Sequence, residues 1–577
     1  MPSAASSRTA QLRLQRLDSD EAQRPLLSHS GKRAMEKPDG VSEPLRSSTA
    51  KASIDLNSIV EEGETLFERK CLLINREIDS NGMGRYQWYI WFLCGFGYFL
   101  DLLWAQAFGL VLQPLEQELG FAGNQSGNIS IAFSAGLTAG AFVWGVLVDI
   151  IGRKWAFNIT CLISAAFGLG LGGCNTYNAF LVVTAFVGFG IGGNIPIDTT
   201  ICLEFIPQNK RFMLALLSIF QPIGVVCTCI IAYGFIPNYS CEPNFTHGKN
   251  ALPSCKNVAS GQACCTRSSN MGWRYLMFTI GGITLGVFFL RFVVFNFQES
   301  PKFLVYRGQD AKAVQVLEHV AKTNKRSCGV TLADFEALDH EDSMRTDGMH
   351  RTEGPSTWKG KFGAEMLRYR SLFQDWRMTR LTILVWLTYA FDYWGFTLAG
   401  TYLPSILAIK NGALDLSLRH TYRSYIAIYA PGIVGVVLGA MMYGVPAFGR
   451  KWTMVISSAL MGISIFLFST VNSEASNIGL NVMEYFFQSM FNSVLYGWTP
   501  EVFAAPIRGT ASGVASFWGR LFSILAPLTA QSVIPAGGLS VDNGSINEVL
   551  YLAGGLTMGA VLTTALLPNR AIGKQSM

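Results

Sequence analysis

The strongest candidates for function are three of the charged residues inside long apolar segments of the sequence, where a charge is costly to bury. A Tyr-x-x-Asp unit occurs twice and ends at Asp101 and at Asp392. Arg520 lies deep in another apolar segment, at 511–535. Ionisable side chains at such depth are rare and usually mark a substrate or ion pathway. Because burial disfavours the charged form of a carboxylate, both aspartates are candidate proton carriers. The structural alternative is a hydrogen-bonded carboxylate that fixes helix packing.

Neighbouring side chains could assist these charges. Tyr98 and Tyr389 precede the two aspartates by one helical turn and could hydrogen-bond to them. Arg520 could bind a substrate carboxylate in a bidentate manner, or pair with an aspartate of the protein. The arginine favours an organic anion as the substrate, although internal pairing is equally compatible with the sequence.

Other polar and aromatic residues in the apolar segments are weaker candidates. Asp198 follows a proline that could break its helix, and a substrate or proton role is predicted for it. Trp104 and Trp394 stand beside the repeated aspartates and could stack on a substrate, although most such tryptophans serve packing. Glu484 is expected to anchor the outer end of its helix at the membrane interface.

The composition predicts an all-α membrane protein. Of 577 residues, 50% are hydrophobic and 15% are charged, whereas soluble chains carry about 25% charge. A helical span needs about 20 apolar residues, and the segments are too continuous for barrel strands. Twelve segments of this kind are expected at 88–112, 127–149, 155–174, 178–202, 212–236, 273–297, 380–406, 424–447, 452–471, 479–503, 511–535 and 548–567.

The chain is also an internal repeat. The sequence Gly-Arg-Lys-Trp at 152–155 recurs 297 residues later at 449–452. Another pair repeats in the same register, so that Glu204 and Arg211 correspond to Glu501 and Arg508. Two motifs in one register indicate two copies of one design, and two copies built from apolar helices predict a transporter with two parallel six-helix repeats.

Basic residues occur in alternate connections, which places both termini in the cytoplasm by the positive-inside rule. The same alternation argues against nucleic acid as the reason for the net charge of +6. The expected organisation is a mostly disordered cytoplasmic tail at 1–87, bundles at 88–301 and 380–567, a cytoplasmic loop at 302–379 and a C-terminal tail at 568–577.

The connection 237–272 is the long loop assigned to the opposite side. It contains Cys241, Cys255, Cys264 and Cys265, and an oxidising compartment would favour disulfides over free thiols. Four cysteines allow three pairings. Adjacent Cys264 and Cys265 seldom bond to each other, so each is expected to reach back to Cys241 or Cys255. Candidate glycosylation sites on this side are Asn238, Asn244 and Asn543.

A cytoplasmic motif between the second and third segments carries a family resemblance. The pattern G-x-x-x-D-x-x-G-R-K from Gly145 to Lys154 resembles the signature of the major facilitator superfamily. Gly152 suits the turn, Asp149 could dock on the positive end of a neighbouring helix, and Arg153 could pair with a carboxylate. The second repeat has Pro446 at the place of Asp149, so asymmetric gating is expected.

The resemblance extends over residues 84–570. Segments 84–88, 192–196 and 271–275 are similar to the synaptic-vesicle-protein-related and niacin-transporter-like branch, including its fungal members, and Glu299-Ser-Pro-Lys resembles a sugar-porter element. The family implies that Gln221 contacts substrate and that cytoplasmic charges form a breakable ring. That ring would place Arg153, Glu204 and Arg211 against Arg450, Glu501 and Arg508, with Glu299 nearby.

These observations predict a secondary active transporter of the major facilitator fold with twelve transmembrane helices. A small polar organic solute would move by alternating access with proton symport, an organic acid being favoured over a sugar because the paired glutamines of glucose carriers are missing from the seventh segment. A proton-driven exporter and a non-transporting receptor or vesicle protein are alternatives. No enzyme motif, metal cluster or cofactor site is seen, and a monomer in the plasma membrane is favoured over a vacuolar or vesicular location.

Overall fold

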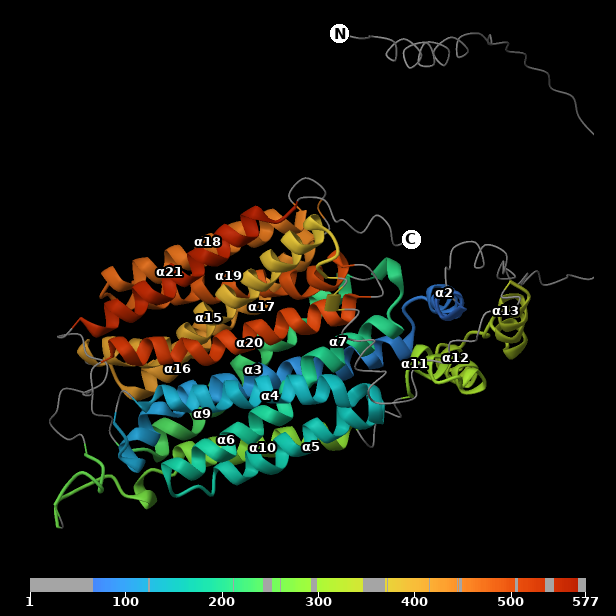
Figure 1. The fold of residues 1–577 in the computed structure, drawn as a ribbon. Helices are drawn as coiled ribbons and strands as arrows, with labels where there is room; N and C mark the ends of the chain where they lie inside the picture. The colour runs from blue at the N-terminus through green and yellow to red at the C-terminus, as the bar shows by residue number, and fades with distance from the viewer. Residues whose placement is uncertain are drawn as a thin grey trace, which may run out of the picture. The chain divides into compact units, whose positions relative to one another are not determined.

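The computed structural model describes residues 66–122, 125–210, 212–241, 252–259, 261–291, 298–345, 369–370, 372–414, 416–443, 445, 449–503, 507–534 and 544–568. Most of these residues belong to long helices that lie nearly parallel to one another (Figure 1). The helices of the first repeat are α3 (Arg85–Leu119), α4 (Gly127–Ile151), α5 (Arg153–Leu171), α6 (Tyr177–Gly192), α7 (Asn194–Phe205), α8 (Phe212–Leu217), α9 (Phe220–Tyr239) and α10 (Gly272–Phe289).

The second repeat follows the same plan, and Figure 1 shows its helices in yellow to red beside the blue and green helices of the first. Its helices are α15 (Trp376–Ala413), α16 (Leu418–Tyr429), α17 (Pro431–Tyr443), α18 (Gly449–Thr470), α19 (Glu474–Val502), α20 (Arg508–Val533) and α21 (Ser545–Leu566). In each repeat, a short break divides helices that continue one another, as between α6 and α7 or α16 and α17.

Eight spans in the described part of the chain are long and apolar enough to cross a membrane. The remaining long helices of the two bundles are α10, α15, α19 and α20, which pack among those spans. Each of the twelve apolar segments predicted from the sequence therefore coincides with a helix or a broken helix pair. The prediction of an all-α membrane fold in two repeats is confirmed.

The two bundles meet along α3, α4 and α9 on one side and α15, α20 and α16 on the other. One close approach between the bundles joins Gly109 on α3 and the backbone of Gly400 on α15. A Cβ atom at position 109 would lie 2.9 Å from the Gly400 carbonyl oxygen. Glycine at this position therefore lets the two backbones cross in contact.

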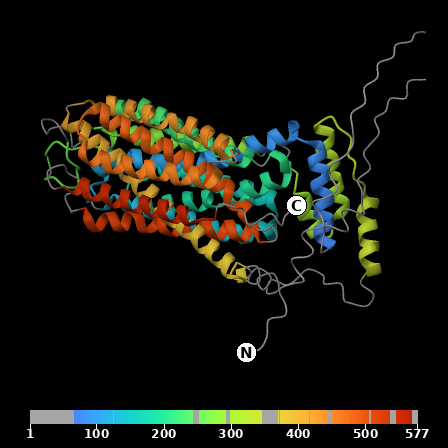
Figure 2. The same ribbon diagram turned by 90° about the horizontal axis from the view of Figure 1, so that it is seen from above.

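One end of the bundles carries a cluster of short helices, here called the cap (Figure 2). It consists of α2 (Leu66–Asn81), α11 (Pro301–Tyr306), α12 (Asp310–Thr323) and α13 (Leu332–Arg345). Residues such as Leu73 and Ile74 of α2 are buried in one apolar core with Leu317 and Phe335 of the other cap helices. The expected organisation, a mostly disordered tail at 1–87 and a loop at 302–379, did not include these helices.

Charged contacts fix α2 to the rest of the cap. The Lys70 ammonium lies 2.6 Å from the Asp310 carboxylate and 2.8 Å from that of Asp339. Asn324 accepts a hydrogen bond from the Tyr86 backbone N–H at 2.9 Å and donates one to the Gln87 side chain at 2.8 Å. The cap is thus attached to the first turn of α3 in the first bundle.

The opposite end, here called the loop end, carries the connection between α9 and α10. Within its described part, Cys241 is bonded to Cys265 and Cys255 to Cys264. The loop is held on α3, because the Ser254 hydroxyl donates to the Glu118 carbonyl at 3.3 Å and the Gln117 amide donates to the Leu252 carbonyl at 2.8 Å.

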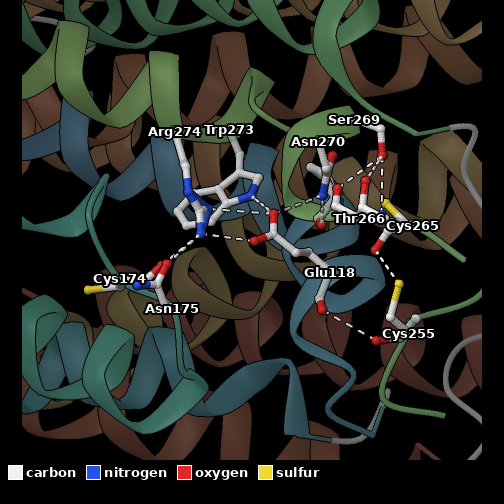
Figure 3. A network of polar contacts seen from close by, with 12 residues as sticks. Glu118, Cys174, Asn175, Cys255, Cys265, Thr266, Ser269, Asn270, Trp273 and Arg274 are labelled. Atoms are coloured by element: carbon white, nitrogen blue, oxygen red, sulfur yellow. Dashed lines mark hydrogen bonds and ion pairs between the residues drawn. The ribbon is translucent and has the colours of Figure 1, made fainter. Parts of the chain in front are cut away.

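Glu118 joins this loop to the helices beneath it (Figure 3). Its carboxylate lies 2.9 Å from the Arg274 guanidinium and accepts a hydrogen bond from the Trp273 indole N–H at 2.8 Å. Arg274 also donates to the Cys174 carbonyl at 2.9 Å. The loop end of the first bundle is therefore joined as one unit through α3, α10 and the connection between α5 and α6.

Candidate substrate cavity

A cavity of about 110 Å³ lies between the two bundles. Helices α3, α4 and α9 line it from the first bundle, and α15, α16, α19 and α20 line it from the second. Aromatic and aliphatic side chains make up much of the wall. The polar residues of the wall are Asp101, Gln106, Ser130, Ser134, Tyr393, Thr397, Thr401, Tyr429, Glu484, Tyr485, Arg520 and Ser523.

Asp101 and Arg520 face this cavity from opposite bundles. Arg520 is 2% exposed, and its Nη1 atom donates to the Leu137 carbonyl at 3.4 Å, while its Nε atom has no partner in the described structure. The guanidinium acts electrostatically on Asp101, yet the ion pairs of the described residues do not include these two. The guanidinium therefore keeps donors that a bound anion could use.

Asp392 is not part of the cavity wall, whereas the next residue, Tyr393, lines the cavity. The Tyr393 ring packs on Gly519, where a Cβ atom would lie 2.8 Å from the ring, and its hydroxyl accepts a hydrogen bond from Tyr496 at 3.1 Å. Asp392 is 1% exposed, and its Oδ1 atom has no partner among the described atoms. The repeated Asp positions are thus not equivalent, because only Asp101 is part of the cavity wall.

Glu484 was expected at the membrane interface, and the structure corrects this expectation. It lines the cavity beside Tyr485 and is only 6% exposed. Its helix α19 begins at Glu474, ten residues earlier, so Glu484 lies about 15 Å along the helix axis. A charged residue inside an apolar segment was the signal available in the sequence.

The two tyrosines that precede the aspartates do not bind them. The Tyr98 hydroxyl is 2.8 Å from the Thr199 hydroxyl on α7, and the Tyr389 hydroxyl donates to Thr499 on α19 at 3.1 Å. The hydrogen bonds predicted from the Tyr-x-x-Asp spacing are therefore replaced by bonds between helices. The same type of contact occurs in both repeats, which indicates a packing role.

Three further candidates lie away from the cavity wall. The Trp104 indole is fully buried and donates to Thr284 at 3.0 Å, and the Trp394 indole donates to Thr529 at 3.3 Å. Gln221 is 4% exposed in the first turn of α9. None of the three is among the residues that line the described cavity.

Asp198 also lies outside the cavity, in the interior of the first bundle. Its carboxylate is 3.7 Å from the Arg291 guanidinium, and both side chains have 0% exposure. Arg291 was not among the predicted site residues, although it is a charged residue inside the apolar segment 273–297.

The residues of the motifs predicted to be cytoplasmic make contacts within each repeat. Arg450 lies 2.8 Å from Glu501, and both belong to the second bundle. Glu299 accepts a hydrogen bond from the Lys154 backbone N–H at 3.3 Å, next to Gly152, whose φ is 97°. A carboxylate at the N-terminus of α5 is stabilised by the helix dipole.

The other members of the predicted ring are less completely described. Glu204 lies on α7, half-buried. Arg211 lies outside the described residues, as do the side chains of Asp149, Arg153 and Arg508, and Gly145 is described only as part of α4. A ring that spans the two bundles therefore stays a prediction.

The predicted glycosylation sites differ in their surroundings. Asn238 is the penultimate residue of α9, where its amide donates to the Gly234 carbonyl at 2.8 Å and accepts from Arg419 at 3.3 Å. Asn244 and Asn543 lie outside the described residues.

Toward the loop end, polar contacts join the two bundles, and the one between Thr401 and Ser130 lies in the cavity wall itself. The Tyr422 hydroxyl donates to the Leu110 carbonyl at 2.7 Å, Thr401 donates to Ser130 at 2.9 Å, and Gln531 donates to Asn128 at 2.9 Å. At the cap end, Gly497 on α19 packs on Ala215 of α8, where a Cβ atom would lie 2.9 Å from the alanine Cβ. Contacts on both sides of a cavity are what an alternating gate requires.

Two helix bundles with a charged cavity between them define a secondary transporter. The family profile of "Sugar (and other) transporter" matches residues 105–543, and the chain belongs to this family of the major facilitator superfamily.

Relatives and solved structures agree with this assignment. The chain is 33% identical to MFS siderochrome iron transporter 1 of Ceriporiopsis subvermispora over 89% of this chain and 93% of that protein. It is 24% identical to the putative niacin/nicotinamide transporter NiaP of Bacillus subtilis over 76% and 86%. The fold is similar to a partially occluded inward-open structure of the xylose transporter XylE from E. coli, with a TM-score of 0.59, 14% identity and coverage of 84% and 100%.

Proposed function

We propose that this transporter carries a small organic acid in symport with protons. The observation that supports this proposal is the Arg520 guanidinium, which is buried in the cavity wall with an unpartnered Nε atom and a single weak bond to a carbonyl. A planar guanidinium matches a carboxylate bidentately. The aromatic side chains around it suit a small, partly apolar acid rather than a sugar. The niacin in the name of one relative is an acid of this kind.

Asp101 is the proposed proton carrier. It lines the same cavity and has no hydrogen-bond partner in the described structure. It also interacts electrostatically with Arg520 across the bundle interface. Binding of a carboxylate at Arg520 would remove the favourable effect of the guanidinium on the ionised aspartate and so favour its protonation. Substrate and proton binding would then be coupled at one place, as symport requires.

The proposed topology places the cap end in the cytoplasm and the loop end outside. The bonded cysteines at the loop end suit an oxidising compartment, and Asn244 is the better glycosylation candidate because Asn238 lies within a helix. A monomer in the plasma membrane fits this arrangement.

Uptake into proteoliposomes with an inward proton gradient tests the proposal. Purified protein should accumulate a radiolabelled monocarboxylate, such as nicotinate or benzoate, above its external concentration, and a protonophore should abolish accumulation. Asp101→Asn should lose gradient-driven accumulation but keep exchange of internal and external substrate. Arg520→Gln should lose both. The control is Arg423→Gln at an exposed position of α16.

Two results would contradict the proposal. Gradient-driven accumulation that survives in Asp101→Asn would exclude Asp101 as the coupling group. A protein that moves sugars but no carboxylate would overturn the substrate class.

A further inference from the structure

The proposed carboxylate site at Arg520 leaves another part of the cavity wall unexplained. Glu484 on α19, Tyr485 beside it and Gln106 on α3 lie in the same wall. Gln106 follows Asp101 by five residues, so it lies about 7.5 Å farther along α3 toward the loop end. Tyr429 joins these residues, because it is near both Gln106 and Glu484.

These residues are buried, and several of their polar atoms lack a hydrogen-bond partner in the described structure. Gln106, Tyr485 and Glu484 are 7%, 4% and 6% exposed. The Nε2 atom of Gln106 and the hydroxyl of Tyr485 have no hydrogen-bond partner in the described structure, and no hydrogen bond or ion pair involves the Glu484 carboxylate there. Leaving buried polar atoms unsatisfied is destabilising, so their convergence on one cavity indicates the position of a ligand group.

The charges of the wall indicate what kind of group this is. Among the cavity-lining residues, Arg520 is the cation and Asp101 and Glu484 are the carboxylates. A substrate that is only an anion would add a negative charge beside Glu484, which is costly in a buried site. A substrate that also carries a positive nitrogen would neutralise Glu484. With Asp101 protonated for symport, the charges of the loaded cavity would then cancel.

We propose that Glu484, Gln106 and Tyr485 form a second subsite that receives a cationic nitrogen of the substrate, while Arg520 holds its carboxylate. The transported molecule is then a small amphoteric acid rather than a simple anion. This inference rests on the proposed function, because it assigns the second end of a molecule whose first end is bound by Arg520.

A matched pair of probes tests the subsite. N-methylpyridinium-3-carboxylate carries a permanent positive nitrogen, and 3-methylbenzoate has the same shape without it. Binding to the purified protein is measured by isothermal titration. The wild type should bind the zwitterion at least tenfold more tightly than 3-methylbenzoate. Glu484→Gln should reduce this ratio to below threefold, and Glu484→Asp should restore part of it. Arg520→Gln should weaken both probes.

The outcomes separate this inference from the proposed function. Equal binding of both probes by the wild type, or an unchanged ratio in Glu484→Gln, overturns the subsite and leaves the carboxylate site intact. An unchanged ratio with loss of proton-driven uptake would identify Glu484 as a proton carrier instead, which also overturns the subsite. Failure of the wild type to bind either probe contradicts both proposals. Elution of each variant as a monodisperse peak controls for folding.

Discussion

Asp198 and Arg291 form an ion pair inside the first bundle, with 3.7 Å between the carboxylate and the guanidinium and 0% exposure of both side chains. Arg291 also donates to the Phe157 carbonyl at 3.3 Å and to the Leu93 carbonyl at 3.5 Å, and its guanidinium lies 3.8 Å from the centre of the Phe157 ring. The pair thus ties together α3, α5, α7 and the residues that directly follow α10. It holds the interior of the first bundle, away from the cavity.

Removal of one partner should be far more harmful than removal of both. Arg291→Met leaves Asp198 as an isolated buried carboxylate and should lower stability by about 3–5 kcal/mol. The double variant Asp198→Leu/Arg291→Met should recover much of this loss, since no charge stays unpaired. Denaturant unfolding in detergent, followed by tryptophan fluorescence, measures the difference. Equal destabilisation by the single and double variants would show that the pair contributes chiefly through packing.

Gly97 provides the space for this pair. A Cβ atom at position 97 would overlap the Asp198 carboxylate and lie 2.9 Å from Arg291 Nη2. Gly97→Ala should therefore displace the pair and cost about 1–3 kcal/mol. Gly282 on α10 is the matched control, because nothing lies within 4 Å of a Cβ there. Gly282→Ala should be neutral or slightly stabilising, since alanine favours the helix, and a similar loss in both variants would contradict the steric explanation.

The sequence predicted the bundles well, because the length of each apolar segment can be read from consecutive residues. The motifs at Gly152 and Gly449 could likewise be matched to each other directly in the sequence. It did not predict the cap, since α2 and α12 are short amphipathic helices whose apolar faces are complete only when they meet. Their contact brings Lys70 together with Asp310, 240 residues away. Such a pairing depends on the tertiary fold and leaves no local pattern.

The candidate site was predicted in part for a related reason. Burial of charge can be read from an apolar segment, so Asp101 and Arg520 were found and do face one cavity. The direction in which a side chain points from its helix cannot be read in the same way. The Tyr98 hydroxyl contacts Thr199 instead of Asp101 for this reason. For Arg291, the same signal of a charge in an apolar segment was present but was not used.

Lys70 should control the attachment of α2 to the cap. It contacts two carboxylates while its own side chain is 8% exposed. Lys70→Met should therefore leave Asp310 and Asp339 facing each other and release α2, with a cost of about 1–3 kcal/mol. Limited trypsin digestion should cut faster after Arg76, which lies on the same helix. Lys325→Met, in the turn after α12, serves as the control, and equal digestion of both variants would argue against the bridge.

The Cys328 thiol should be unreactive at neutral pH. Burial, and secondarily the nearby Glu77 carboxylate, raise its pKa to about 12. Because the thiolate is the reactive form, its population at pH 8 is about a thousandfold lower than for a thiol of pKa 9. Labelling with iodoacetamide, followed by peptide mass spectrometry, should increase about tenfold per pH unit up to the stability limit of the protein. Glu77→Gln should raise the rate only in part, since burial is the larger cause, and fast labelling at pH 7 would contradict the assignment.

Tyr422 should help to keep the cavity closed at the loop end. Its hydroxyl donates across the bundle interface to the Leu110 carbonyl at 2.7 Å, whereas Tyr425, one turn away, donates to the Pro404 carbonyl at 2.6 Å within its own bundle. Tyr422→Phe removes about 0.5–1.5 kcal/mol from the closed state only, which shifts the opening equilibrium up to about tenfold. Labelling of Ser134→Cys in the cavity wall by an impermeant thiosulfonate should accelerate accordingly in Tyr422→Phe. Tyr425→Phe should leave the labelling rate unchanged, because the hydrogen bond from Tyr425 to Pro404 is present whether the bundles are together or apart. Faster labelling in both variants would indicate a general loosening of the structure instead of a gate at Tyr422.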